Sequence, residues 1–304
     1  MEDRIIGTRF VDRYDVEALL GTGGMGRVYL ARDRLGDLPV ALKVIRDDLL
    51  DHPELVPRFR REARAASRID HENVTRILDF GQDPEGRPYL AMEYIRGPSV
   101  ARQLAEAGPF RVESGLPVLR QVAEALAAAH RCQVVHRDLK PGNVLLADHE
   151  RRPLVKIVDF GLAKILGLGS GSIVTPLGHT FGTAGYISPE QAADEELDER
   201  ADIYSFGVLA FEMLTGKVPF SGSTVDVVSA HVYKSPPSLA ETAPLPVPPA
   251  VEQMVLRCLA KRPGQRYQEA LELSRDLGAL ERLFTDSGGP REAAGPPGDP
   301  PPRP

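Results

Sequence analysis

Hydrophobic and polar positions divide this chain into two parts with different periodicity. Between residues 14 and 94, short alternating or β-branched runs such as "RVYLARD", "PVALKVI", "TRILDFG" and "PYLAMEY" are separated by the turn formers "LGDLP" and "DPEGRP". This pattern predicts strands of an antiparallel sheet. One stretch, "ELVPRFRREARAASRI", has helical spacing and high helix propensity instead. We therefore expect a small β lobe that contains one helix.

The second part, residues 95 to 284, is mostly helical in its pattern. The stretch "LPVLRQVAEALAAAHR" repeats apolar residues at helical spacing, and "DIYSFGVLAFEML" is apolar almost all round, which predicts a buried helix. The apolar face of the first of these helices is expected to contain Leu119, Val122, Ala123, Leu126 and Ala129. The expected fold class is α+β, with a small β lobe, a larger helical lobe and a cleft between them.

The amino-acid composition limits the classes of protein to which this chain can belong. With 304 residues, 42% of them hydrophobic, the chain can bury a large core, and its formal charge of -6 offers no general attraction for nucleic acid. Two cysteines, Cys132 and Cys258, lie in apolar helical patterns and are expected to be buried thiols in the reducing cytosol. No apolar run is long enough for a membrane span, and the charged start does not resemble a signal peptide.

The last segment, residues 285 to 304, has a different composition. Proline and glycine dominate "DSGGPREAAGPPGDPPPRP", which leaves almost nothing to pack. This composition predicts disorder. We interpret the segment as a tail or as a truncated linker.

A glycine-rich stretch, "LLGTGGMGRVYLA", matches the pattern G-x-G-x-x-G. Val28 and Leu30 alternate after it as in a strand, whereas a dinucleotide fingerprint would open a helix. A glycine hairpin between strands can bring backbone N–H groups over phosphates, because no Cβ stands in the way. The residues of this expected phosphate cover are Gly21, Thr22, Gly23, Gly24, Met25 and Gly26.

A lysine in "VALKV" stands on an apolar strand face. Lys43 shares its face with Ala41 and Ile45, so its charge needs a partner. Glu62, in the predicted helix of the β lobe, is a candidate partner. Lys43 would then hold phosphate oxygens as a point charge.

Two further stretches, "VVHRDLKPGN" and "KIVDFG", carry the remaining chemistry. Phosphoryl transfer needs a residue that orients the attacking hydroxyl and oxygen ligands for Mg²⁺. We expect Asp138 to accept or orient the hydroxyl proton and Lys140 to neutralise charge on the phosphoryl group. Asn143 and Asp159 are the expected metal ligands.

In order and spacing, these motifs resemble those of eukaryotic-type protein kinases. The amino-acid sequences of the motifs are most similar to those of bacterial serine/threonine kinases. The resemblance spans roughly residues 14 to 284 and also includes "GTAGYISPE". It implies transfer of the γ-phosphoryl group of ATP to serine or threonine hydroxyls of proteins in signalling, with Mg²⁺, or alternatively Mn²⁺. It also implies that Glu190 pairs with Arg266 and that Asp202 anchors the catalytic loop. Bacterial kinases of this type often continue through a linker into a membrane span, so the resemblance also implies that residues 285–304 can be the start of such a linker.

The resemblance further implies a nucleotide site. The side chains that would sandwich adenine are Leu20, Val28, Ala41 and Leu145. Met92 would be the gatekeeper, and the backbones of Glu93 and Ile95 would bond the base. Apolar walls with two polar contacts suit a flat heterocycle.

Regulation is expected in the segment after Asp159. Arg137 is the family's receptor for a phosphothreonine, and Thr175 and Thr180 are the candidate sites of autophosphorylation, in a transient homodimer. Thr183 corresponds to a threonine that contacts the catalytic Asp and Lys, so it is expected to position substrate.

Two alternatives to an active protein kinase share much of this pattern. A catalytically dead scaffold would keep the fold, but here Lys43, Glu62, Asp138, Asn143 and Asp159 are all present. A small-molecule phosphotransferase would not need the long segment that ends in "GTAGYISPE". Incubation with Mg·ATP alone separates the three, because only an active protein kinase labels itself or a generic protein.

Overall fold

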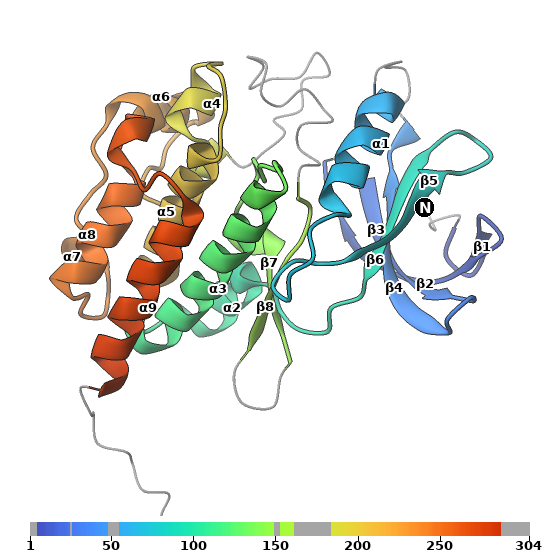
Figure 1. Cartoon of the computed structure of the whole chain (residues 1–304), viewed down its shortest axis with the longest axis horizontal. Helices are drawn as coiled ribbons and strands as arrows, with labels where there is room; N and C mark the ends of the chain where they lie inside the picture. The colour runs from blue at the N-terminus through green and yellow to red at the C-terminus, as the bar shows by residue number, and fades with distance from the viewer. Residues whose placement is uncertain (1–4, 25, 48–54, 149–152, 161–183, 287–304) are drawn as a thin grey trace, which may run out of the picture.

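The computed structural model describes residues 5–24, 26–47, 55–148, 153–160 and 184–286, and it has two lobes (Figure 1). The first is a six-stranded antiparallel sheet with strand order β1-β2-β3-β4-β6-β5, covered by one helix, α1 (Leu55–Ala66). Its strands are β1 (Arg9–Phe10), β2 (Tyr14–Thr22), β3 (Gly26–Asp33), β4 (Leu38–Ile45), β5 (Ile77–Gln82) and β6 (Pro88–Glu93). The predicted β lobe with one helix is therefore confirmed, with β1 added before it.

Strand β4 is buried on both faces. Val40 and Leu42 point into one apolar cluster, whereas Ala41 and Ile45 belong to a second cluster that includes Phe59 of α1. This alternation follows from the period-two geometry of a strand. It places Lys43 on the α1 side of the sheet, as the sequence predicted.

The second lobe is mainly helical, apart from a small hairpin of two strands. It contains α2 (Val100–Ala107), α3 (Val112–Arg131), β7 (Val144–Ala147), β8 (Leu154–Ile157), α4 (Pro189–Ala192), α5 (Arg200–Thr215), α6 (Thr224–Tyr233), α7 (Leu239–Thr242), α8 (Pro249–Cys258) and α9 (Ala270–Asp286). Short 3₁₀ turns occur at Pro141–Asn143, Ala184–Tyr186 and Pro263–Gln265. The expected α+β fold class is confirmed.

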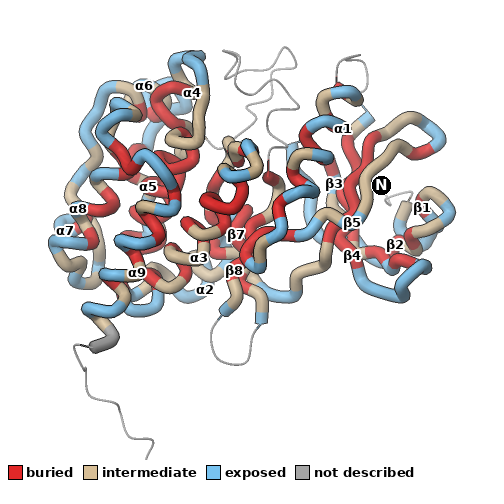
Figure 2. Tube along the Cα trace, in the orientation of Figure 1, coloured by how far each residue is buried: buried red, intermediate tan, exposed pale blue. Residues whose placement is uncertain are grey.

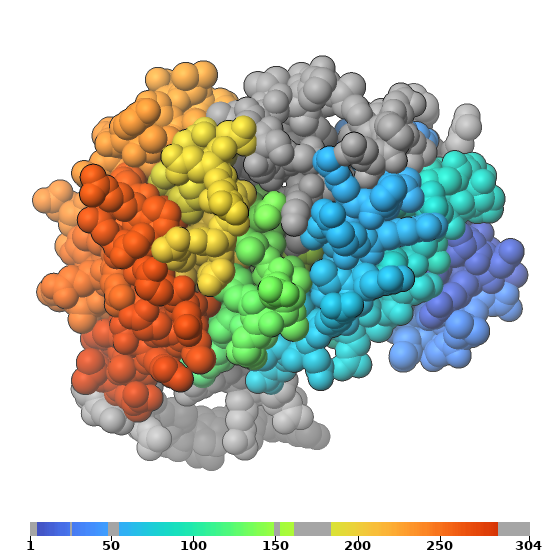
Figure 3. All heavy atoms as spheres, turned by 45° about the horizontal axis from the view of Figure 1, so that its top comes forward, coloured from blue at the N-terminus to red at the C-terminus, as the bar shows by residue number. Residues whose placement is uncertain are grey.

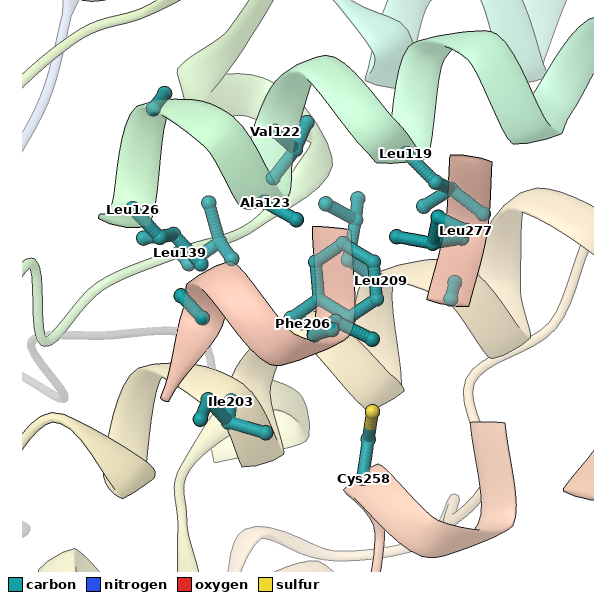
Figure 4. Packing of buried hydrophobic residues seen from close by; sticks show 14 of the residues in the cluster. Leu119, Val122, Ala123, Leu126, Leu139, Ile203, Phe206, Leu209, Cys258 and Leu277 are labelled. Atoms are coloured by element: carbon teal, nitrogen blue, oxygen red, sulfur yellow. The ribbon is translucent and has the colours of Figure 1, made fainter. Parts of the chain in front are cut away.

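The core of this lobe lies where α3, α5, α8 and α9 meet (Figure 4). The five predicted core positions of α3 are all fully buried. Helix α5 is buried along almost its whole length (Figure 2). A Cβ on Gly207 would lie 2.8 Å from the Cβ of Cys258, so the close approach of α5 to α8 requires glycine there.

Two expectations about the ends of elements change. Cys258 is buried, but Cys132 is only partly buried because it follows the last residue of α3 and caps that helix. Helix α9 continues through Asp286, two residues beyond the domain end expected at residue 284. Residues 287–304 lie outside the described residues, so the disordered tail stays a prediction. Among the described helices, none is both long enough and apolar enough to cross a membrane.

Candidate active site

The glycine-rich hairpin joins β2 to β3 at the edge of the first lobe. Its backbone closes through a hydrogen bond from Gly23 N–H to the Gly26 carbonyl, 2.8 Å long. Gly26 is buried, and a Cβ there would lie 2.1 Å from the carbonyl oxygen of Val44 in β4. Gly21 has no atom within 4 Å of a built Cβ. The protein itself thus requires glycine at position 26, and the phosphate-cover argument applies to Gly21, Gly23 and Gly24. Met25 lies outside the described residues.

Lys43 is buried, and its ammonium bonds Asp159 Oδ1 at 2.8 Å. Burial disfavours the charged carboxylate of Asp159, but the charge and hydrogen bond of Lys43 outweigh this and lower the pKa of Asp159. Glu62, also buried, accepts hydrogen bonds from Arg61, at 3.2 Å from Nε and 3.1 Å from Nη2. The Lys43–Glu62 pair therefore stays a prediction, and Asp159 is the partner that the structure gives to Lys43.

The catalytic loop is anchored by Asp202, which lies fully buried in α5. Its two carboxylate oxygens accept the backbone N–H groups of His136 and Arg137, each at 2.8 Å. His130 Nε2 lies 2.8 Å from Oδ2 as well. Burial opposes ionisation, but the hydrogen bond from His130 and the backbone donors lower the pKa of Asp202. The expected anchoring role of Asp202 is confirmed.

Two residues of the site have left-handed backbone conformations. Arg137 has φ +68° and Asp159 has φ +66°, which is uncommon for residues other than glycine. His136 holds the two segments together, because its Nε2 lies 3.0 Å from the Val158 carbonyl and its ring packs edge-on against Phe160. Strained conformations of this kind persist where surrounding contacts maintain them, and they cluster at functional sites.

Asp138 lies at the centre of a set of polar contacts. Lys140 Nζ bonds its Oδ2 at 2.7 Å. Asn143 Nδ2 donates to the Asp138 carbonyl at 2.8 Å and to Oδ2 at 3.2 Å. Because the amide nitrogen of Asn143 is engaged in this way, its Oδ1 remains as the atom suited to a metal ion. The three residues that the sequence placed in one loop thus contact one another.

The donor set of this site fits magnesium. An amide oxygen from Asn143 and a carboxylate from Asp159 are hard ligands, and Mg²⁺ bound with a nucleotide typically takes only one or two carboxylates from the protein. Within the described ranges no group of three His, Cys, Asp or Glu side chains has metal-binding geometry. A dedicated all-protein metal cage is therefore not found among these residues.

The expected adenine walls come from both lobes. Ala41 and Met92 are buried neighbours on paired strands β4 and β6, Val28 is partly exposed in β3, and Leu20 is 44% exposed. Leu145 lies in β7 of the second lobe. These positions suit a cleft that is open to a ligand.

The segment between the lobes shows contacts that sequence reasoning missed. The N–H of Glu93 donates to the Arg76 carbonyl at 3.0 Å, so only its carbonyl can serve a base. Its carboxylate bonds Lys156 of β8 at 2.6 Å. A Cβ on Gly97, which has φ +148°, would lie 2.0 Å from the Leu146 carbonyl. The glycine in "YIRGPS" was the one available signal of this close approach.

The 3₁₀ turn Ala184–Tyr186 and helix α4 follow the undescribed residues 161–183, and we call them the polar shelf. Ser205 Oγ donates to the Tyr186 carbonyl at 2.9 Å, and the Tyr186 hydroxyl bonds Glu212. Ser188 caps α4 in a reciprocal capping box with Gln191. The side-chain amide of Gln191 donates to the Arg137 carbonyl at 3.0 Å, which ties α4 to the catalytic loop.

Glu190 and Arg266 form the ion pair that the resemblance implied. Both are buried, and the guanidinium bonds both carboxylate oxygens, at 2.6 and 2.8 Å. Arg266 also donates to the carbonyls of Ala260, Lys261 and Arg200. Thr175, Thr180 and Thr183 lie outside the described residues, so their roles remain predictions.

Comparison with known proteins gives the family. A family model described as a protein kinase domain matches residues 14–275. The chain belongs to the protein kinase family. It is 40% identical to the serine/threonine-protein kinase pkn3 of Myxococcus xanthus over 96% of this chain and 54% of that protein. It is also 38% identical to PrkC of Bacillus subtilis, over 90% of this chain and 41% of that protein.

Two further kinases are also similar to most of this chain. PknB of Mycobacterium tuberculosis is 39% identical over 88% of this chain and 42% of its own length. The solved kinase domain of M. tuberculosis PknI matches with a TM-score of 0.70 and 26% identity, over 90% of this chain and 98% of that domain. The chain thus spans about half the length, or less, of these curated relatives. The predicted resemblance to bacterial serine/threonine kinases is confirmed.

Proposed function

We propose that this chain transfers the γ-phosphoryl group of ATP to serine or threonine hydroxyls of proteins. The main support for the proposal is that Asp138, Lys140 and Asn143 contact one another in one loop. In addition, Asp159 bonds Lys43 of the other lobe. Phosphoryl transfer depends mainly on positioning and on electrostatic stabilisation. This constellation supplies charged and polar groups for both tasks.

Each of these residues has one role in the proposed mechanism. The carboxylate of Asp138 receives the hydrogen bond of the attacking hydroxyl and orients the oxygen. Lys140, already 2.7 Å from that carboxylate, neutralises the negative charge on the transferring group. Lys43 bonds nucleotide phosphate oxygens. Asn143 and Asp159 hold Mg²⁺, which supplies charge neutralisation on the phosphates when bound.

The same geometry favours a protein acceptor over a small molecule. The shelf of Ala184–Tyr186 and α4 is tied to the catalytic loop through Gln191 and to α5 through Ser205, so an extended chain can lie on a fixed surface beside Asp138. A serine or threonine acceptor agrees with Lys140 two positions after Asp138. Because the reaction consumes ATP, we place this domain on the cytoplasmic side of the cell.

Activation by phosphorylation of Thr175 or Thr180 belongs to the same proposal. Arg137 is partly buried, and burial lowers the pKa of its guanidinium, although the charges of Asp202 and Glu62 act in the opposite direction. A phosphate carries about -1.5 to -2 charge and forms charge-assisted bidentate bonds with arginine. A phosphothreonine beside Arg137 would therefore be stabilised strongly. Removal of phosphate with a phosphatase should lower activity, and Arg137→Ala should abolish that difference.

The test of the proposed chemistry is Asp138→Asn. This change keeps the shape of the side chain but removes the carboxylate, so single-turnover transfer to a protein substrate should fall by about 10² to 10⁴ while the Kd for ATP stays nearly constant. Asp148→Asn, the same change at an exposed position, is the matched control and should leave the rate unchanged. An Asp138→Asn rate above about a tenth of the parent rate contradicts the assignment.

A further inference from the structure

Helix α1 has a strongly basic outer face. From residue 55 to residue 68 the chain holds five arginines and one glutamate, a net formal charge of +4 in a protein whose total is -6. Arg60, Arg61, Arg64 and Arg68 are exposed and line an open hollow of about 530 Å³ over this helix. We call the surface formed by Arg60, Arg61, Arg64 and Arg68 the basic face.

The charge of the basic face is poorly neutralised within the chain. Arg60 bonds the neutral amide of Gln82, and Arg61 bonds Glu62. Over the part of the chain that the structure describes, Arg64 and Arg68 make no ion pair. Arginines four residues apart on a helix repel one another, so Arg60 and Arg64 oppose the stability of α1 unless an anion lies against them, and Arg68, two residues after the helix, adds to the same positive charge.

A cluster of opposite charge follows α4. Residues 194–199 read "DEELDE" and carry five carboxylates. Asp198 pairs with Arg200, at 2.5 Å, whereas Asp194, Glu195 and Glu196 are exposed and have no ion pair in the described ranges. We call Asp194, Glu195 and Glu196 the acidic turn.

The basic face and the acidic turn lie on the same side of the molecule. Figure 3 brings forward the upper side of Figure 1, and α1 and the residues around α4 are both visible on it, at the two lobes. The acidic turn begins three residues after Gln191, whose side chain bonds the catalytic loop at Arg137. A macromolecule that docks on both surfaces therefore contacts both lobes on the side where α4 is tied to the catalytic loop.

We propose that a second copy of this chain docks here, with the basic face of each copy against the acidic turn of the other. A two-fold axis makes such a contact self-complementary, since each basic–acidic pairing occurs twice. The partner must present several exposed carboxylates that lack ion pairs of their own, and the chain itself presents them on the required side. This proposal rests on the proposed kinase function, because transfer to Thr175 or Thr180 of another copy requires that the catalytic sites of the two copies face each other.

The strength of the contact follows from its chemistry. Two copies with a formal charge of -6 each repel at long range, and only the uneven placement of charge opposes this repulsion. Ion pairs at an exposed surface contribute little individually and are screened by salt. The pairing is therefore weak and transient, and it weakens as ionic strength rises.

Charge exchange between two copies tests the pairing. The phosphate acceptor is an Asp138→Asn copy, and the donor is an active copy. One variant carries Arg64→Glu and Arg68→Glu, and the other carries Glu195→Lys and Glu196→Lys; Asp194 is kept because its φ of +57° favours aspartate. Reversal of either patch in both copies should slow transfer at low salt by about tenfold, the size expected when opposite charges become like charges.

The decisive mixture combines a donor with a reversed basic face and an acceptor with a reversed acidic turn. Both contacts across the axis are then attractive again, so the rate should return to within about threefold of the parent rate, because charge complementarity is restored. The control is Arg111→Glu with Arg275→Glu, which makes the same charge change at an exposed position just before α3 and at an exposed position of α9. If neither reversal slows transfer, or if the mixture stays as slow as the single reversals, the proposal is wrong.

Two further readouts keep this result separate from the proposed function. Each charge reversal, made in a copy that keeps Asp138, should phosphorylate a short uncharged peptide at the parent rate, since none of the charge-reversed residues belongs to the catalytic site. If the parent chain labels no peptide, the kinase function fails, and the pairing is then judged by cross-linking. An Arg64→Cys copy and a Glu196→Cys copy, both with Cys132→Ser, should be joined by a short bismaleimide faster at low salt than an Arg275→Cys control pair. Equal rates overturn the pairing.

Discussion

At the scale of single residues, the glycine loop shows that one motif combines two kinds of constraint. Gly26 is glycine because the carbonyl of Val44 occupies the space of a side chain. Gly23 has no such neighbour, since its nearest atom is 3.9 Å from a built Cβ. Glycine at position 26 is required by the fold, whereas glycine at position 23 leaves room for a ligand.

Gly26→Ala and Gly23→Ala should therefore differ. Gly26→Ala should lower the free energy of unfolding by roughly 2–4 kcal/mol, because β3 or β4 must move to accept the methyl group. Gly23→Ala should keep the melting temperature and raise the KM for ATP. Denaturant unfolding and steady-state kinetics on both variants check this, and equal loss of stability in the two would contradict the distinction.

His231 illustrates a single residue that sets a pH dependence. It is fully buried in α6, with Nδ1 2.9 Å from the Tyr204 hydroxyl. Burial, with the nearby charge of Lys261, lowers the pKa of His231 to about 4. The unfolded chain takes up a proton near pH 6.5 and the folded chain does not until about pH 4, so stability is present above pH 6.5 and is lost as the pH falls toward 4.

His231→Gln should flatten this dependence. Between pH 7.5 and 5.5, the parent should lose about 1.4 kcal/mol more than the variant, the cost of one pH unit below an unfolded pKa near 6.5. Urea unfolding at both pH values measures it, and the comparison of slopes cancels any constant effect of the substitution. Parallel stability curves for the two proteins would show that His231 does not titrate as described.

At the scale of elements, buried charges connect helices that are distant in the chain. Asp202 joins α5 to the catalytic loop, and the Glu190–Arg266 pair joins α4 to the segment after α8. The large cost of removing one member of a buried pair arises from the charge that stays behind. Such pairs specify one arrangement of the helices.

Arg266→Met should destabilise the protein by about 3–5 kcal/mol, because Glu190 is left buried without its partner. Adding Glu190→Leu should recover part of this loss. Recovery should be incomplete, since the carbonyls of Ala260, Lys261 and Arg200 also lose their donor. Melting temperatures of the single and double variants test the argument, and a double variant less stable than Arg266→Met alone would refute it.

At the scale of the whole molecule, polar contacts join the two lobes at several places, among them the backbone hydrogen bonds of Asn73 and Thr75 with Ile157 of β8. Lys43 reaches Asp159, and Glu93 reaches Lys156. A ligand that holds Lys43 on one side and Asn143 with Asp159 on the other therefore joins the lobes. Binding to the folded state alone then adds stability by mass action.

Mg·ATP at about 100 times its Kd should raise the free energy of unfolding by about 2.7 kcal/mol. In a protein of this size, the melting temperature should rise by several degrees. Asp159→Asn should lose the part of this shift that depends on Mg²⁺, because it removes a hard anionic ligand. Thermal unfolding with ATP alone, Mg²⁺ alone and both measures each part. An Asp159→Asn protein with an unchanged Mg²⁺-dependent shift would exclude this residue as a ligand.

Much of this architecture was predictable from local patterns. Alternation of Val40 to Ile45 gave the buried strand and the side on which Lys43 lies, and helical spacing gave the core face of α3. The loop from Asp138 to Asn143 is short, so its residues must meet in almost any fold. These features depend on neighbours in the chain, whose side chains share a face or a turn for reasons of backbone geometry.

Other features depend on how elements pack, and no local pattern contains them. The Gln191–Arg137 contact joins residues 54 apart, and the need for glycine at position 26 comes from the backbone of another strand. The sequence alone suggested Glu62 as a partner of Lys43, which stays a prediction, and the packed molecule adds the carboxylate of Asp159, 2.8 Å from the ammonium. A lone buried charge predicts that a counter-charge exists, but its identity follows only from the distances that packing of the two lobes creates.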